Sequence, residues 1–290
     1  MMENKSDPSH THPQSRLPTG LIVPVATPFE TDLSICQSAY IGHLSWLSGK
    51  GVTRLIVGGT TAEFFSLSIA ERLTLLKLGR KHFPGFIIFN ISADSVATTV
   101  EMAKRAQRHG ADALLCLPPY YYAGAPRSGL IAYFSAIASE CDLPFYLYNF
   151  PEHTGNPITR EILQKVPHTG LKDSAADFTL IAHTPYYLLG GDARIVKAYR
   201  KGACGYVPGF PNVFPEIYLD LEKLLIKKEY ERAEMLQLKI NAFKQSLPKV
   251  AHIVAIKTYL NRILDSYPAA VRPPLDGSPG KAFNHSPMLL

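Results

Sequence analysis

The feature that most constrains this 290-residue sequence is a repeated alternation between short apolar runs and longer segments of helical periodicity. The runs are apolar at almost every position, as expected for strands of a parallel sheet that is buried on both faces. Eight of them occur, at residues 21–25, 54–58, 86–90, 113–117, 145–149, 169–172, 186–189 and 205–207. Eight βα units within roughly 210 residues predict an α/β fold, a (β/α)8 TIM barrel with additional C-terminal helices. An open doubly wound sheet is the alternative.

The same pattern divides the chain into four stretches. Residues 18–227 form the predicted barrel, and residues 228–270 form a helical extension with apolar faces in the segments 230–243 and 251–264. Residues 1–17 are polar, have no apolar stretch typical of a secretion signal, and are expected to be a disordered tail. His10 and His12 have the chemistry of metal ligands, but these surroundings favour the disordered tail. Residues 271–290, rich in Pro and Gly, are expected to be an extended tail.

Composition excludes several classes of protein. No apolar run approaches the roughly 18 residues that a membrane span requires. The net charge of +6 comes from scattered basic residues, and no nucleic-acid recognition motif is present, so we expect no nucleic-acid partner. The four cysteines are far apart and form no CxxC pair, which indicates neither a zinc site nor a redox pair and favours a reduced, cytoplasmic setting.

Polar residues follow several of the apolar runs, and functional groups of a barrel lie at these carboxyl ends of the strands. Lys172 ends the sixth run, at a position that should be largely buried, and burial disfavours its ammonium form. A neutral amine can attack a ketone to form a Schiff base, and the protonated imine then acts as an electron sink. Alternatively, Lys172 extends to solvent or pairs with Asp173.

Three further groups lie at the ends of other predicted strands. Tyr148 ends the fifth run, beside the predicted position of Lys172, and its hydroxyl could shuttle a proton. Thr60 and Thr61 follow paired glycines, and their hydroxyl and N–H groups suit a carboxylate. Each has a structural alternative: a core tyrosine for the first, and a helix-capping turn for the threonines. Residues 120–122, three tyrosines after two prolines, indicate either a functional loop or an interface.

Taken together and in order, the strand ends resemble those of the dihydrodipicolinate synthase and N-acetylneuraminate lyase superfamily of class I Schiff-base pyruvate aldolases. The resemblance covers about residues 17–270 and includes the C-terminal helices. It rests on segments 27–29 (TPF), 59–63 (GTTAE), 119–121 (PYY), 148–151 (YNFP) and 170–174 (GLKDS), and on Asn212 and Pro215.

The resemblance implies a catalytic role for four residues. Lys172 would form the imine with pyruvate, and Tyr148 would be the acid and base. Thr60 would be a link in the proton relay of Tyr148, and Tyr121 would be lent to a neighbouring subunit.

It also implies a substrate pocket and an assembly. Thr60 and Thr61 would cradle the carboxylate of pyruvate, and Gly191 and the backbone of Val207 would be further pocket positions. The chemistry needs no metal and no organic cofactor, only the covalent imine at Lys172. Members of this superfamily are usually homotetramers built as dimers of dimers, and their partners are small keto acids and aldehydes.

Two departures bear on the substrate. Dihydrodipicolinate synthases usually have an arginine at the position of His153, where it holds the carboxylate of the aldehyde, and a neutral imidazole cannot replace a bidentate guanidinium. Ala62 replaces a usual glycine, which narrows the pocket by one methyl group. The segment 146–151 (YLYNFP) is closer to that of 2-keto-3-deoxy-sugar-acid aldolases. We therefore expect a lyase that cleaves such a sugar acid reversibly to pyruvate and an aldehyde, with His153 in the substrate pocket.

Three other functions are weighed against this expectation. A 4-hydroxy-tetrahydrodipicolinate synthase would condense pyruvate with aspartate semialdehyde, and a dehydratase of keto-deoxy sugar acids would use the same imine. A barrel without catalytic activity, serving as a binding protein, would be expected to lack the lysine or the tyrosine. Both Lys172 and Tyr148 are present, which favours an enzyme.

Overall fold

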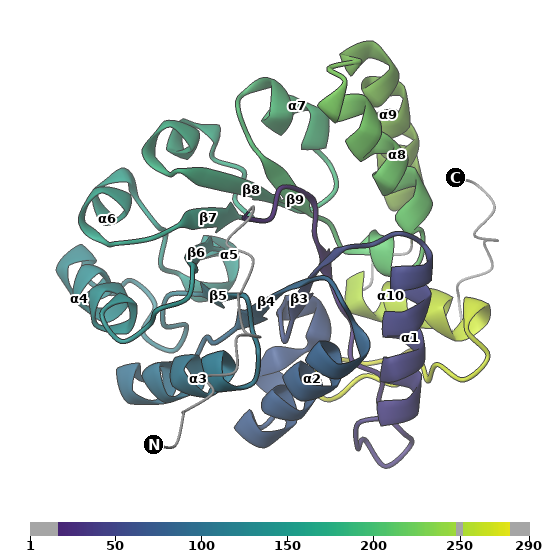
Figure 1. Cartoon of the computed structure of the whole chain (residues 1–290), viewed down its shortest axis with the longest axis horizontal. Coiled ribbons are helices and arrows are strands. Elements are labelled where there is room, and N and C mark those ends of the chain that lie inside the picture. Colours follow the sequence, from purple (N-terminus) through teal and green to yellow (C-terminus); the bar gives the residue numbers. More distant parts are fainter. Residues whose placement is uncertain (1–16, 248–251, 279–290) are drawn as a thin grey trace, which may run out of the picture.

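The computed structural model describes residues 17–247 and 252–278, and one closed ring of parallel strands forms their centre (Figure 1). The hydrogen-bonded order is β1-β9-β8-β7-β6-β5-β4-β3-β2. The strands are β1 (Gly20–Leu21), β2 (Val23–Pro24), β3 (Arg54–Val57), β4 (Phe86–Asn90), β5 (Ala113–Cys116), β6 (Phe145–Asn149), β7 (Gly170–Asp173), β8 (Tyr186–Gly190) and β9 (Gly205–Val207).

The first predicted strand occurs as two short pieces, and these pieces close the barrel. β1 pairs in parallel with β9, and β2 pairs in parallel with β3. Ile22, between the two pieces, donates its backbone N–H to the carbonyl of Tyr206 over 3.0 Å. Asn212 adds a side-chain link, donating to the carbonyl of Pro24 and accepting from the N–H of Ala26. The expectation of a (β/α)8 barrel is confirmed, and the doubly wound alternative is wrong because the sheet closes on itself.

Alternate strand positions face two different apolar layers. One set of side chains fills the interior of the barrel, including Ile56 and Ile88, which are register partners on adjacent strands. The other set, including Leu55 and Ile87, packs outward against the helices. Strands buried on both faces read as continuous apolar runs, which is why the sequence pattern was so regular.

The helices surround the strands (Figure 1). Between β7 and β8 the connection is a 3-10 helix, Phe178–His183. The sequence did not indicate a short helix directly after β6, α5 (Pro151–Thr154). The remaining barrel helices are α1 (Gln37–Gly49), α2 (Ile69–His82), α3 (Val96–Arg108), α4 (Arg127–Ala138), α6 (Arg160–Lys165), α7 (Ile195–Arg200) and α8 (Pro215–Ile226).

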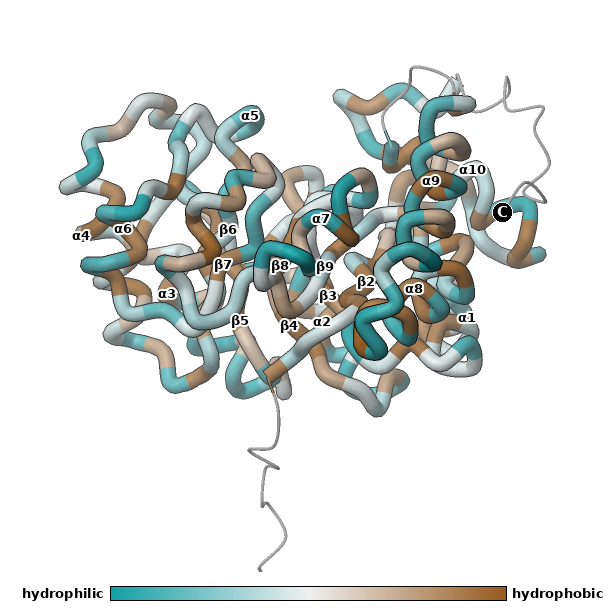
Figure 2. Tube along the Cα trace, turned by 90° about the horizontal axis from the view of Figure 1, so that it is seen from above, coloured by the Kyte–Doolittle hydropathy of each residue, from teal (hydrophilic) through white to brown (hydrophobic). Residues whose placement is uncertain are grey.

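Two further helices follow the barrel, α9 (Tyr230–Ser246) and α10 (His252–Ile263). Together with α8 they lie at one side of the barrel, where Figure 2 shows apolar residues along the tubes. Phe243 of α9 packs against Phe214 and Phe210 after β9, with ring centroids 5.3 and 5.2 Å apart. The extension is therefore packed onto the same core as the barrel.

Some expectations concern parts of the chain that the structure does not describe. Residues 1–16, with His10 and His12, and residues 279–290 lie outside the described residues. Within residues 17–247 and 252–278, no helix is long and apolar enough to cross a membrane. Over the same ranges, no three or more His, Cys, Asp or Glu side chains gather as a group that could hold a metal ion. The four cysteines are free thiols.

Candidate active site

Lys172 and Tyr148 lie side by side at the carboxyl ends of β7 and β6, inside the barrel. They are register partners across the two strands, so their side chains point to the same face. The Nζ atom of Lys172 lies 3.7 Å from the centre of the Tyr148 ring. Both side chains are almost completely buried, at 4% and 2% exposure. An amine and a phenol are thus held together in a site from which bulk water is largely excluded.

The side chain of Asp173 lies on the opposite face of β7, where four groups donate hydrogen bonds to its carboxylate. Its carboxylate accepts hydrogen bonds from the Asn149 amide over 2.8 Å and from the Tyr187 hydroxyl over 2.7 Å. The backbone N–H groups of Ala175 and Asp177 donate to it as well. The alternative in which Lys172 pairs with Asp173 is therefore wrong, and the low exposure of Lys172 also excludes a side chain extended to solvent.

The hydroxyl of Tyr148 contacts the turn that follows β3. Thr60 Oγ1 lies 3.2 Å from the Tyr148 hydroxyl, as the proton-relay prediction requires of these two atoms. Burial by itself would raise the pKa of Tyr148. The positive charge of Lys172 and hydrogen bonds to Thr60 and Ser174 outweigh burial, so the pKa of Tyr148 is lowered. The phenol is thereby better prepared to give up a proton.

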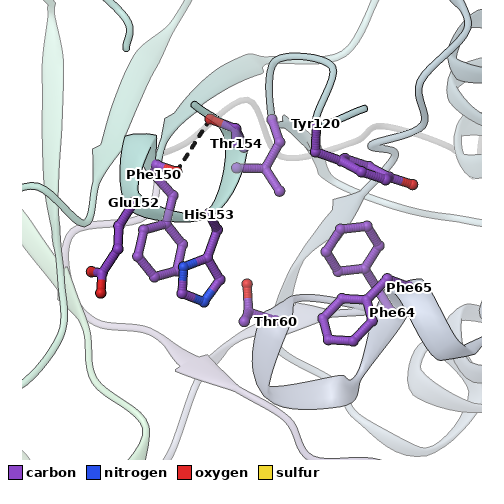
Figure 3. A pocket seen from close by; sticks show the side chains of 9 residues that line it. Thr60, Phe64, Phe65, Tyr120, Phe150, Glu152, His153 and Thr154 are labelled. Atoms are coloured by element: carbon purple, nitrogen blue, oxygen red, sulfur yellow. Dashed lines mark hydrogen bonds between the residues drawn. The ribbon is translucent and has the colours of Figure 1, made fainter. Parts of the chain in front are cut away.

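A cavity of about 390 Å³ lies beside Thr60, whereas Lys172 and Tyr148 are not among its lining residues (Figure 3). Its lining residues are Thr60, Phe64, Phe65, Leu117, Tyr120, Phe150, Glu152, His153 and Thr154. Rings connect the cavity to Lys172: Tyr148 stacks on Phe150 at 5.8 Å, and Phe150 stacks on His153 at 4.0 Å between centroids. His153 belongs to α5, which begins two residues after the end of β6, and this short helix places the imidazole in the cavity wall.

A second, smaller cavity of about 200 Å³ lies at the ends of β7 and β8. It contains Gly191, whose N–H donates to the carbonyl of Val207 over 3.0 Å. Gly191 has φ +103°, a conformation that favours glycine. Lys244 and Arg194 also line this cavity, and Lys244 contacts the buried carboxylate of Asp192 over 3.2 Å.

Most of the predicted site residues lie at the same end of the barrel, but they do not all line the same cavity. Thr60 and His153 line the larger cavity, and Gly191 lines the smaller one. Tyr121 is 80% exposed and lines neither cavity. Thr61 and Val207 are in the lining of neither cavity, although Val207 packs inside the barrel.

The sequence analysis did not assign several residues that line the larger cavity, among them three phenylalanines and one glutamate. Phe64 and Phe65 directly follow the segment 59–63, and Phe150 and Glu152 flank Pro151, the last residue of the segment 148–151. Because these residues lie within a few positions of predicted strand ends, the sequence could have indicated them as candidates for the site. The 3-10 turn Phe64–Ser66 and the short helix α5 position these side chains, and both are too short to produce a periodic apolar pattern in the sequence.

Comparison with known proteins identifies relatives for nearly the whole described chain. A model of the Dihydrodipicolinate synthetase family matches residues 17–279. A 4-hydroxy-tetrahydrodipicolinate synthase of Exiguobacterium sp. is 30% identical over 235 residues, which cover 77% of this chain and 80% of that protein. An uncharacterized DapA-like lyase of Pyrococcus abyssi is 28% identical over 283 residues, which cover 91% and 95% of the two chains.

Solved structures with the same fold include two of direct interest. A prophage protein of the dihydrodipicolinic acid synthase family from E. coli K12, in complex with pyruvate, superposes with a TM-score of 0.83 at 24% identity. That match covers 92% of this chain and 96% of the other. A catalytic lysine mutant of the sialic acid aldolase of Ruminococcus gnavus has a TM-score of 0.82 at 23% identity, with 89% of each chain covered.

Proposed function

Since this chain belongs to the dihydrodipicolinate synthetase family, we propose that it is a Schiff-base lyase that cleaves a 2-keto-3-deoxy sugar acid reversibly to pyruvate and an aldehyde. The observation that carries the proposal is the buried contact of 3.7 Å between Lys172 Nζ and the ring of Tyr148. The R. gnavus aldolase has a catalytic lysine, and the E. coli relative binds pyruvate. Lys172 is the residue of this chain that we assign to the same task.

The proposed reaction uses the Lys172 amine as the nucleophile and the Tyr148 hydroxyl as the acid and base. The Lys172 amine attacks the C2 ketone, and the Tyr148 phenol gives its proton to the departing hydroxyl group, so that loss of water leaves a protonated imine and a Tyr148 phenolate. The Tyr148 phenolate takes the proton of the C4 hydroxyl as the C3–C4 bond breaks, and the electron pair of that bond forms an enamine. The same proton returns to C3, and water hydrolyses the imine to release pyruvate. The cation on the imine nitrogen favours the phenolate, in line with the lowered pKa of Tyr148.

The larger cavity supports a polyhydroxylated aldehyde rather than one with a carboxylate. Among the described residues that line it, none is Arg or Lys, and Glu152 contributes a negative charge. A carboxylate on the aldehyde would be repelled there and would find no bidentate partner. Hydroxyl groups can donate to Glu152 and bond to His153, while the C–H faces of a sugar chain pack on Phe64 and Phe150.

We further propose that the enzyme works as a homotetramer in which Tyr121 serves a neighbouring subunit. The 80% exposure of Tyr121 in its own chain supports this role, because nothing in the same chain covers it over most of its surface.

Pyruvate release from a panel of 2-keto-3-deoxy sugar acids tests the proposed activity. We expect at least one member of the panel to be cleaved with equal amounts of pyruvate and aldehyde. Condensation of pyruvate with aspartate semialdehyde at a higher kcat/KM would assign the synthase activity instead. A product that keeps all the carbon atoms of the substrate would assign a dehydratase.

A charge change at the cavity wall should alter the choice of aldehyde. His153→Arg is expected to raise kcat/KM for aspartate semialdehyde about tenfold or more, because a charge-assisted hydrogen bond contributes about 1.5–3 kcal/mol. His153→Gln, which keeps polarity without a charge, is the control and should leave that value within about threefold. Steady-state kinetics with pyruvate at saturation provide the measurement. Equal effects of the two variants would contradict the electrostatic account of this wall.

A further inference from the structure

An ion pair with no exposure to solvent connects the C-terminal extension to the barrel mouth. Lys257 of α10 and Glu63, which follows the first 3-10 turn after β3, approach to 2.5 Å, and both side chains are 0% exposed. Two charges removed from water in this way are costly unless their surroundings hold them closely. The surroundings are therefore the key to what the pair does.

The partners of these two charges come from the chain after α10. Lys257 Nζ donates to the carbonyl of Ala270 over 2.7 Å, and the backbone N–H of Arg272 donates to Glu63 over 2.9 Å. The guanidinium of Arg272 donates in turn to Ser66 and Glu71, over 2.7 and 3.0 Å. Glu63 thus contacts α10 through Lys257 and the chain after α10 through Arg272.

Glu63 also sits at the backbone joint between two short turns. The turns are Thr60–Ala62, which carries the hydroxyl that contacts Tyr148, and Phe64–Ser66, which carries a wall of the cavity. Glu63 has φ 57°, a left-handed conformation that is uncommon for a residue with a side chain. Its N–H bonds to the carbonyl of Thr60, and its carbonyl accepts from Ser66. Such a conformation persists where the surrounding structure enforces it.

We propose that Glu63 and Lys257 are positioning residues for catalysis: their ion pair fixes the Thr60 turn so that the Thr60 hydroxyl meets that of Tyr148. Neither residue lines either of the two cavities. Lys257 acts through Glu63, and Glu63 acts through the turn on either side of it. This inference rests on the proposed function, because it gives the contact between Thr60 and Tyr148 a role in proton transfer.

Two measurements with pyruvate alone separate positioning from folding. Borohydride trapping reports imine formation, which needs Lys172. Exchange of the C3 hydrogens of pyruvate for deuterium, followed by NMR, reports proton transfer through Tyr148 and Thr60. In Lys257→Met we expect trapping within about threefold of wild type and exchange lowered about 10- to 100-fold, since small misplacements of catalytic groups cost this much.

Two further variants complete the design. Arg54→Met removes a cation from the opposite end of β3, where Arg54 pairs with Glu222 over 2.8 Å, and should leave the exchange rate unchanged. Glu63→Gln combined with Lys257→Met removes both charges while the amide oxygen can still accept from Arg272. Its exchange rate should recover at least half of the loss on a logarithmic scale, because no buried charge remains unpaired. This double variant also decides the matter if Lys257→Met does not fold.

The inference is overturned if folded Lys257→Met exchanges deuterium within threefold of wild type. It is also overturned if trapping and exchange fall by the same factor, or if the double variant loses as much as the single one. A wild-type protein that neither traps nor exchanges pyruvate would instead overturn the proposed function. The two failures are therefore distinguishable.

Discussion

Replacing Lys172 with alanine is expected to lower pyruvate release at least about 10³-fold, because the covalent route through the imine disappears. Lys172→Arg should be equally inactive, since a guanidinium is always protonated and cannot attack a ketone. Both variants should keep the thermal unfolding midpoint within a few degrees. Pyruvate release measured on each variant beside its circular dichroism spectrum provides the comparison.

Retention of more than a tenth of the wild-type rate in a folded Lys172→Ala variant would contradict this account. Lys165→Ala is a suitable control. That lysine is exposed and pairs with Glu161 on the surface of α6, where such pairs contribute little. Its activity should equal that of the wild type.

Replacing Tyr148 with phenylalanine is expected to lower kcat by about 10²- to 10³-fold while leaving the imine intact, because general acid–base catalysis contributes about 10²- to 10⁴-fold. Phenylalanine keeps the ring that lies beneath Lys172 Nζ and the stacking on Phe150, and it removes only the hydroxyl. Deuterium exchange at C3 of pyruvate should fall by a similar factor. The amount of imine trapped by borohydride at Lys172, once imine formation has reached equilibrium, should stay near the wild-type level.

Thr60→Val is the companion variant, since it deletes the hydroxyl that contacts Tyr148 and keeps a side chain of similar shape. It should lower kcat less than Tyr148→Phe does, because Tyr148 can still act through Ser174. A larger loss in Thr60→Val than in Tyr148→Phe would reverse the order of the proposed relay.

Much of the fold follows from burial on both faces of each strand. Runs such as 86–89 and 113–117 are apolar throughout, and they mark strands because a barrel strand has no solvent-exposed side. Lys172 and Tyr148 follow from the same logic. A polar residue that ends an apolar run lies at the functional end of the barrel.

Other features depend on contacts between residues far apart in the sequence. The pair of Glu63 with Lys257 joins positions 194 residues apart, and neither neighbourhood indicates its partner. The split of the first strand depends on pairing with β9 on one side and β3 on the other. The placement of His153 over the cavity depends on α5, a single turn too short to leave a periodic pattern. Such features are decided by packing and not by local preference.

Reductive trapping tests the central claim most directly. The protein is incubated with pyruvate and sodium borohydride, digested, and analysed by mass spectrometry. We predict one reduced pyruvyl group per chain, located on the peptide that contains Lys172 and absent when pyruvate is omitted. An unmodified Lys172 peptide, or modification of another lysine in its place, would contradict the account.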